Sequence, residues 1–320
     1  GLSAADLLNR AGNTVTVFEK NDAIGGLLRY GIPDFKLNKR VIDRRLELFA
    51  EEGIKFKTNF NVGVDISKEE LLDKFDAVIL AIGAEQPRDL PVEGRDLDGV
   101  HYAMDFLTQQ NKVVAGQTIK RGTKISAKNK NVLVIGGGDT GSDCVGTSIR
   151  QSAKSVTQIE ILPKPPKKRE NNNPWPYWPN TLRTSSSHKE GCERRWSLST
   201  KRFIGEEGKL KQVELVEVEW NKDQKGRWNM SEVPGTTEIV DVDLVLLSMG
   251  FTQPVHGGLL SDLGVKYDQR GNVKVNDKKQ SSIEKVFAAG DAEKGASLVV
   301  HAIEAGKVAA KSVDAFLRGA

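Results

Sequence analysis

Cysteine is scarce in this 320-residue chain, which contains only Cys144 and Cys192. Two cysteines cannot build a disulfide framework, and their scarcity indicates a reducing compartment, so we expect a cytoplasmic protein. They also cannot hold an iron–sulfur cluster by themselves, because such a cluster needs about four thiolates. The chain has no C-x-x-C pair, which excludes a redox disulfide of the thioredoxin-reductase type.

Long hydrophobic runs and a strong charge of one sign are also missing. No apolar run approaches the roughly 20 residues that span a membrane, and 47 basic against 43 acidic residues give a net charge of +4. We therefore expect neither a membrane nor a nucleic acid as a partner. The four histidines show no metal-ligand spacing, so no metal site is predicted; they are His101, His188, His256 and His301.

Glycine, in contrast, follows a recognisable pattern. The segment Val132–Gly141 reads VLVIGGGDTG, an apolar strand that runs directly into a G-x-G-x-x-G sequence. Such glycines let the backbone turn tightly and approach a pyrophosphate, whose charge lies at the N-terminus of the following helix. The pattern predicts a cradle for the diphosphate of a nucleotide. Alone it is a weak signal, but the chain carries part of a second unit of this kind.

The second unit lies at the start of the chain. Residues 2–11 have apolar positions at helical spacing, and the apolar strand 15–18 ends at Glu19. A helix, a turn and a strand that ends in an acid form the back half of a βαβ dinucleotide unit. Gly1 would then be the last glycine of its fingerprint, and we expect the chain to be a piece of a longer protein. Alternatively, Glu19 only ends a strand on the surface.

A third pattern is the segment Val286–Ala292, VFAAGDA, which places Gly290 and Asp291 at the end of a strand. We expect a helix to begin near Ser297. A carboxylate at this place can accept hydrogen bonds from a ribityl chain, and a helix N-terminus can stabilise negative charge on a reduced flavin. The alternative is a tight turn followed by a helix cap. The glycine pattern at 136–141 and the half unit that ends at Glu19 thus predict two dinucleotide sites in one chain. Two such sites suggest electron transfer between two cofactors.

The order of these units predicts how the domains are arranged. The strings DAVILAIG (76–83) and DLVLLSMG (243–250) are an internal repeat, one copy for each glycine-rich unit. The last 70 or so residues resemble part of the first domain, which indicates one nucleotide domain inserted into another. The predicted boundaries are 1–110 for the first part of the outer domain, 111–250 for the inserted domain and 251–320 for the return segment.

Several other elements are predicted from periodicity and caps. We expect a helix over 39–52 and a capping box between Ser67 and Glu70. Strands are expected over 54–63, 156–162, 212–220 and 237–242, and an irregular insertion over 163–200.

Taken together, these strings resemble the small (beta) subunit of glutamate synthase and the matching C-terminal portion of the fused enzymes. The resemblance covers essentially the whole chain. It is carried by GGLLRYGIPDFKLNK, DAVILAIGA, VLVIGGGDTGSDC, NPWPYWPNTLRTSSSHKEGCERRWSLSTKRFIG and VFAAGDAEKGASLVVHAIEAGKVAA. It implies an α/β fold of two nested dinucleotide-binding, Rossmann-like three-layer domains of the flavoprotein disulfide-reductase type. In that family, an N-terminal iron–sulfur domain precedes the part that corresponds to this chain.

The resemblance also implies site residues for two cofactors. For FAD, Glu19 would hold the adenosine ribose, Val62 would face the adenine, and Asp291 would bind the ribityl chain. The other residues on the FAD path would be Gly1, Gly25, Gly26, Leu27, Gly83, Gly290, Ser297, Leu298 and Val299. The phosphates of NADPH or NADH would contact Gly136, Gly138, Asp139 and Thr140.

The choice between NADPH and NADH rests on the end of strand 156–162. Lys164 opens a basic run that continues to Arg169, which favours the 2′-phosphate of NADPH. Glu160 lies only two residues before the strand end and could instead serve as the ribose acid of an NADH site.

By resemblance, electrons would pass from the nicotinamide nucleotide to FAD, then to the iron–sulfur clusters and the large (alpha) subunit, which makes glutamate. No protein acid or base is predicted to be catalytic, because the cofactors supply the chemistry. One alternative is a free-standing NADPH:ferredoxin-type or dihydropyrimidine-dehydrogenase-like reductase module. Another is a non-catalytic nucleotide-binding scaffold.

Overall fold

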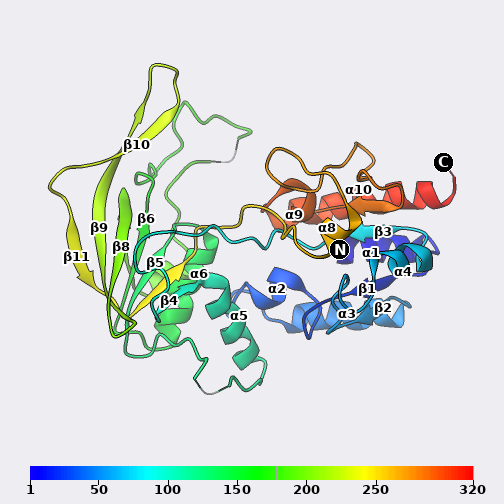
Figure 1. The fold of residues 1–320 in the computed structure, drawn as a ribbon, viewed down its shortest axis with the longest axis horizontal. Helices are drawn as coiled ribbons and strands as arrows, with labels where there is room; N and C mark the ends of the chain where they lie inside the picture. Colours follow the sequence, from blue (N-terminus) through cyan, green and yellow to red (C-terminus); the bar gives the residue numbers. More distant parts are fainter. Residues whose placement is uncertain (121, 178, 320) are drawn as a thin grey trace. The chain divides into compact units, whose positions relative to one another are not determined.

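The computed structural model describes residues 1–120, 122–177 and 179–319, which form two compact units (Figure 1). Unit 1 consists of residues 1–29, 37–88 and 251–320, and unit 2 of residues 30–36 and 89–250. The domain boundaries at 110/111 and 250/251 stay predictions. Residues 89–110 cluster with unit 2 because β4 (Val100–Tyr102) pairs with β12 (Leu244–Leu247).

Unit 1 contains two pairs of short parallel strands. β1 (Thr16–Phe18) pairs with β2 (Lys55–Lys57), and β3 (Val78–Leu80) pairs with β13 (Val286–Ala288). The strand predicted over 54–63 is wrong in its length, because the chain turns at Asn59, whose φ is +50°. The helices of unit 1 are α1 (Leu2–Arg10), α3 (Arg40–Glu51), α4 (Lys68–Lys74), α8 (Leu259–Leu263), α9 (Asp291–Lys294) and α10 (Val299–Leu317), together with α2 (Gly26–Tyr30) up to Arg29.

The ends of unit 1 are joined by the packing of α1 on α10. Ala4 and Leu8 of α1 share one apolar cluster with Ala310 and Val313 of α10. The two helices approach closely at Gly306, where a Cβ atom would lie 3.4 Å from the backbone nitrogen of Ala4. The helix predicted over 2–11 is therefore confirmed as an element that covers the sheet strands of this unit.

Unit 2 is built on a five-stranded parallel sheet in the order β4-β12-β5-β6-β7. Its remaining strands are β5 (Asn131–Ile135), β6 (Ser155–Glu160) and β7 (Glu193–Trp196). The helices α5 (Ala103–Val114) and α6 (Asp139–Arg150) pack on one face. Side chains alternate along β5: Val132 and Val134 lie in the cluster with these helices, whereas Leu133 and Ile135 lie in the cluster on the opposite face.

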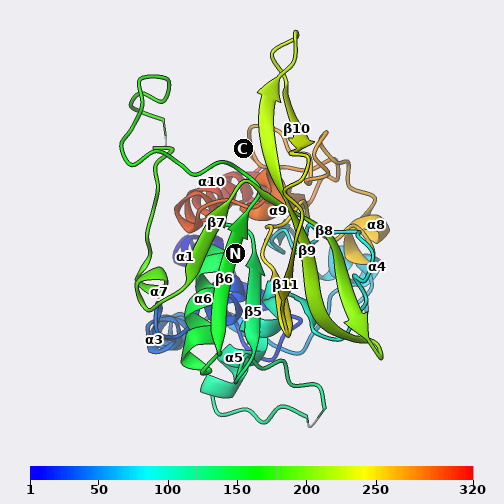
Figure 2. The same cartoon turned by 90° about the vertical axis from the view of Figure 1, so that its left-hand side faces the viewer.

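An antiparallel sheet covers that opposite face, which gives unit 2 three layers. It contains β8 (Leu198–Glu206), β9 (Lys209–Lys222), β10 (Trp228–Glu232) and β11 (Glu238–Asp241). Figure 2 shows β5, β6 and β7 side by side, with β8 and β9 beside them. The strands predicted over 212–220 and 237–242 are confirmed as β9 and β11.

The prediction of an irregular insertion over 163–200 is wrong for its second half. That half holds the short helix α7 (Ser186–Lys189) and the strand β7. Ser185 caps α7, and β7 adds to the edge of the parallel sheet by pairing with β6. Sheet pairing and a side-chain cap thus impose order that composition does not reveal.

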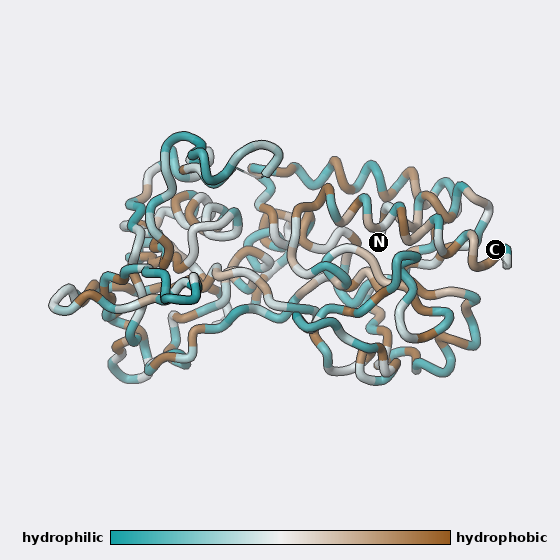
Figure 3. Tube along the Cα trace, turned by 90° about the horizontal axis from the view of Figure 1, so that it is seen from above, coloured by the Kyte–Doolittle hydropathy of each residue, from teal (hydrophilic) through white to brown (hydrophobic). Residues whose placement is uncertain are grey.

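In the part of the chain that the structure describes, no helix is both long enough and apolar enough to cross a membrane. Brown hydrophobic and teal hydrophilic residues alternate along the trace (Figure 3).

The internal repeat is visible in the structure, since β3 and β12 both lead to a glycine with positive φ. These are Gly83 at +74° and Gly250 at +83°.

Candidate functional site

The predicted phosphate cradle is a loop between β5 and the N-terminus of α6. Gly136 has a φ of +122°, and a Cβ atom there would lie 2.4 Å from the carbonyl oxygen of Ser248, so only glycine fits. Gly138 caps α6 and carries no side chain that could compete for the N–H groups of the first turn. Gly138 and Asp139 are exposed and Thr140 is half-buried. An anion can therefore reach the positive end of α6.

Two side chains of β6 hold this loop in place. Gln158 Nε2 donates a hydrogen bond to the Gly136 carbonyl oxygen at 2.8 Å, and Glu160 Oε2 accepts one from the Gly137 N–H at 2.6 Å. A Cβ atom on Gly141 would lie 2.3 Å from the Gly136 oxygen and 2.6 Å from Gln158 Nε2. The last glycine of the fingerprint therefore makes room for both groups.

Gln158 was not among the site residues predicted from the sequence. Its side chain is only 2% exposed, and a glutamine in the middle of a buried strand is unusual, because a buried amide must find hydrogen-bond partners. That anomaly in the string VTQIEI could have identified it.

Two cations lie over an aromatic ring next to the end of β6. Glu160 is the register partner of Trp196 on β7. Lys164 Nζ lies 4.7 Å from the centre of the Trp196 ring, and the guanidinium carbon of Arg194 lies 5.0 Å from it. The predicted residue Lys164 therefore lies at Trp196, the strand neighbour of Glu160.

In unit 1, the acid at the end of β1 is oriented by its neighbour. Glu19 Oε1 accepts hydrogen bonds from the Asn21 backbone N–H at 2.9 Å and from Asn21 Nδ2 at 2.7 Å. An ion pair between Lys20 and Glu85 joins this strand end to the segment after Gly83. Val62 lies half-buried in the turn that follows β2.

The predicted residues around Gly83 and Asp291 share one sheet edge, because β3 and β13 are parallel neighbours. The Ala289 N–H donates to the carbonyl oxygen of Leu80 at 3.1 Å, just before Gly290. Gly1 joins them, since a Cβ atom there would lie 3.1 Å from the Cβ atom of Ala81. The ends of β3 and β13 and the start of α1 therefore lie together.

Asp291 is half-buried and is held by Ser297, whose Oγ donates to Asp291 Oδ1 at 3.0 Å. Burial raises the pKa of Asp291, and the hydrogen bonds from Ser297 oppose that rise. The helix expected to begin near Ser297 is α10, which begins at Val299, because Leu298 is still extended with ψ +145°. Ser297 is thereby free to bond Asp291 instead of capping the helix.

Three of the residues predicted to line the flavin path are exposed apolar side chains. Leu27, which follows the glycine pair Gly25–Gly26, is 45% exposed, Leu298 is 42% exposed and Val299 is 50% exposed. Exposed apolar side chains at predicted cofactor positions are what a bound ring system would cover. Among the described residues, no group of three or more His, Cys, Asp or Glu side chains could hold a metal ion.

Comparisons with known proteins show the family of the chain. The sequence model of the family described as pyridine nucleotide-disulphide oxidoreductase matches residues 1–306. The chain belongs to this family. The expected fold of two nested dinucleotide-binding domains of the disulfide-reductase type is confirmed, and the expected oxidoreductase class and cofactors agree with the family.

The resemblance to glutamate synthase small subunits is confirmed as well. The chain is 49% identical over 322 residues to the NADPH glutamate synthase small chain of Mycobacterium tuberculosis (strain ATCC 25618 / H37Rv). The match covers 100% of the chain and 65% of that relative. The chain is also 45% identical over 328 residues to the NADH glutamate synthase of Saccharomyces cerevisiae (strain ATCC 204508 / S288c). That match covers 99% of the chain and 15% of the relative. The chain thus spans about two thirds of the small chain that it matches.

Among solved structures, the chain is similar in fold to Mycobacterium tuberculosis FprA in complex with NADPH. The TM-score is 0.77 at 18% identity, with 99% of this chain and 82% of that chain covered. It also resembles the thioredoxin reductase of T. acidophilum, with a TM-score of 0.65, 19% identity, and 99% and 95% of the two chains covered. At these identities the likeness concerns the fold.

Proposed function

We propose that the chain is the cofactor-binding part of a glutamate synthase small subunit, which passes electrons from NAD(P)H through FAD. The observation that carries this proposal is that one chain has glycine-containing strand ends of the kind that bind nucleotides in both of its units. One is the Gly136–Gly141 loop of unit 2, and the other is the shared strand edge of unit 1 around Gly83 and Asp291. The identity of almost half of all residues with a glutamate synthase small chain supports it.

In unit 2, the chain would bind and orient the nicotinamide nucleotide. The N–H groups at the start of α6 would bind the phosphates at Gly136, Gly138, Asp139 and Thr140. Lys164 would attract the 2′-phosphate of NADPH, whereas Glu160 would accept a hydrogen bond from the 2′-hydroxyl of NADH.

In unit 1, the chain would bind FAD along the shared strand edge. Glu19 would accept hydrogen bonds from the adenosine ribose, and Asp291 would accept them from the ribityl chain. The start of α10 would stabilise negative charge on the ring. The side chains that would line this path are those of Leu27, Val62, Ser297, Leu298 and Val299, together with the backbone of Gly1, Gly25, Gly26, Gly83 and Gly290.

When bound, the two cofactors supply hydride transfer and the release of single electrons, so the chain itself needs to provide only binding, orientation and electrostatics. The proposed acceptors are iron–sulfur clusters outside this chain and the large (alpha) subunit. A cytoplasmic location fits the free thiols of Cys144 and Cys192.

Dye reduction tests this function. The chain is loaded with FAD, excess flavin is removed, and NADPH or NADH is added with a one-electron dye as acceptor. We expect the dye to be reduced only when flavin and nucleotide are both present, and flavin-free chain serves as the control. A chain that retains flavin and nucleotide but leaves the dye oxidised would be a scaffold, which would contradict the proposal.

A further inference from the structure

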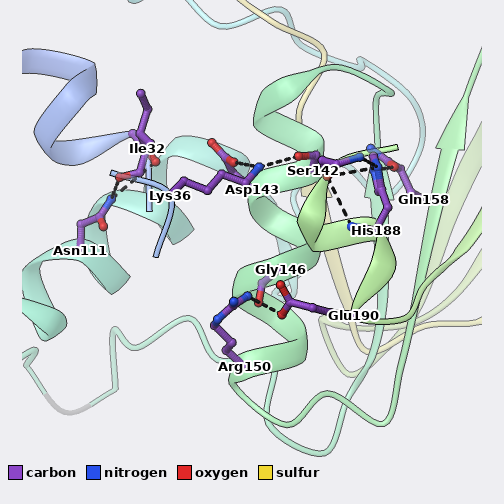
Figure 4. A network of polar contacts seen from close by, with 12 residues as sticks. Ile32, Lys36, Asn111, Ser142, Asp143, Gly146, Arg150, Gln158, His188 and Glu190 are labelled. Carbon is purple, nitrogen blue, oxygen red and sulfur yellow. Dashed lines mark hydrogen bonds and ion pairs between the residues drawn. The ribbon is translucent and has the colours of Figure 1, made fainter. Parts of the chain in front are cut away.

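His188 lies outside the nucleotide loop but is connected to it. It belongs to the short helix α7, within the stretch RTSSSHKEG. The helix packs on α6 at Gly146, where a Cβ atom would lie 2.5 Å from Ser187 Oγ. His188 and α6 are therefore parts of one packed group, and Figure 4 shows His188 next to Gln158 of β6.

The hydrogen bonds of His188 define its tautomer. The Ser185 backbone N–H donates to His188 Nδ1 at 3.1 Å. Because a backbone N–H can only donate, Nδ1 must accept, and in the neutral ring the proton must then lie on Nε2. Nε2 is 2.8 Å from Gln158 Oε1, to which it donates.

This tautomer in turn defines the orientation of Gln158. Since its Oε1 accepts from His188, its Nε2 is the atom that faces the Gly136 carbonyl oxygen, at 2.8 Å. The chain of hydrogen bonds therefore runs from the Ser185 N–H through His188 and Gln158 to the first glycine of the fingerprint. Both ends of the buried amide are satisfied, which is the condition for a buried polar side chain to stabilise one geometry.

We infer that His188 is a positioning residue for the nucleotide: through Gln158 it fixes the Gly136 carbonyl so that the N–H groups at the start of α6 face the diphosphate. This inference rests on the proposed nucleotide site of unit 2. Burial, with Arg194 and Lys36 nearby, lowers the pKa of His188 to about 4, so the ring is neutral at neutral pH. The stretch 183–191 thereby acquires a role in nucleotide binding.

A purely structural role would be different, because His188 also completes the capping box of α7 with Ser185. Two substitutions separate the roles. In His188→Asn, the amide oxygen takes about the place of Nδ1, so the cap is kept and the donor to Gln158 is lost. In His188→Gln, the amide nitrogen takes about the place of Nε2, so the donor is kept and the cap acceptor is lost.

The experiment is a calorimetric titration of NADPH into the wild-type chain and both variants, with thermal unfolding as the control for folding. Positioning predicts that His188→Asn raises the Kd for NADPH about tenfold, while His188→Gln stays within about twofold of wild type. In a Gln158→Leu background, His188→Asn should change the Kd no further. Equal Kd values for all three proteins, or a loss confined to His188→Gln, would overturn the inference.

Two further outcomes keep the test decisive. If the wild-type chain itself does not bind NADPH or NADH, the proposed function fails and the inference fails with it. If a variant does not fold, nitrogen NMR of the wild-type chain replaces it. The proton must then be found on Nε2 of His188, and its signal must shift when NADPH is added; a proton on Nδ1 overturns the inference.

Discussion

The carboxylate of Glu160 accepts the backbone N–H of Gly137 at 2.6 Å, which places an anionic side chain against the loop that would bind the nucleotide phosphates. Its other oxygen accepts from the Leu162 N–H at 3.2 Å. The side chain is therefore fixed at the end of β6, where the second strand of a dinucleotide domain carries its ribose-reading acid. A 2′-phosphate at this place would meet a like charge.

The first prediction concerns this charge. Glu160→Gln keeps an oxygen that can accept from Gly137 but removes the negative charge. We expect the ratio of the Kd for NADPH to that for NADH to fall about tenfold, or ~1.4 kcal/mol. Titration of both nucleotides into the wild-type and variant chains measures the ratio.

Lys164→Gln is the matched control for Glu160, since it removes a positive charge near the same strand end. It should weaken NADPH binding and leave NADH binding nearly unchanged. An unchanged ratio in both variants would show that the adenosine ribose does not lie at the end of β6.

The second prediction concerns the room at Gly141. In Gly141→Ala, the new Cβ atom would lie 2.3 Å from the Gly136 oxygen. Overpacking of this kind should lower the free energy of unfolding by about 2 kcal/mol. Nucleotide binding should be lost as well, because the loop must move. Urea unfolding and NADPH titration measure the two effects.

Gly138→Ala is the control for Gly141, because a Cβ atom there meets nothing within 4 Å. Its free energy of unfolding should stay within ~0.5 kcal/mol of wild type. If Gly138→Ala destabilises the chain as much as Gly141→Ala, the loop geometry described above is incorrect.

The third prediction concerns Asp291. Asp291→Ala removes the proposed acceptor for the ribityl chain and should weaken FAD binding about 30-fold, or ~2 kcal/mol. Asp277→Ala, at an exposed acid of the same unit, is the control and should bind FAD like wild type. Flavin retained after gel filtration measures the effect, and equal retention in both variants would place FAD elsewhere.

The fourth prediction concerns pH. Burial, with Arg194 and Lys36, lowers the pKa of His188 to about 4 in the folded chain, from an ordinary value of 6.5. Between these pH values, the unfolded chain binds the extra proton and the folded chain does not. The contribution of His188 to stability is therefore present above pH 6.5 and is lost as the pH falls toward 4.

Urea unfolding of the wild-type chain and His188→Gln across this pH range tests the prediction. The wild type should lose stability relative to the variant as the pH falls. Parallel pH dependences would mean that His188 titrates normally.

The sequence was sufficient for the features that depend on local chemistry. The glycine fingerprint at 136–141, the acid at the end of β1 and the Gly-Asp pair after β13 all lie at strand ends, where turn residues show a clear pattern. The capping box of α4 was also predicted, and Ser67 Oγ indeed accepts from the Glu70 N–H at 3.1 Å.

Features that depend on contacts between distant segments were beyond the sequence. Residues 30–36 belong to unit 2 although their neighbours on both sides belong to unit 1. Lys36 pairs with Asp143 and donates to Ser142, and Asn111 donates to the carbonyl oxygen of Tyr30. No periodicity in the string YGIPDFK reveals these partners. In the same way, no pattern in the sequence reveals that Gln158 meets His188.

The central claim, that one chain brings NAD(P)H and FAD into electron transfer, is tested most directly by an anaerobic titration. NADPH, and separately NADH, is added to the FAD-loaded chain while the visible absorbance of the flavin is followed. We predict that the retained flavin is bleached by stoichiometric nucleotide. Retained flavin that keeps its absorbance with both nucleotides would contradict the claim.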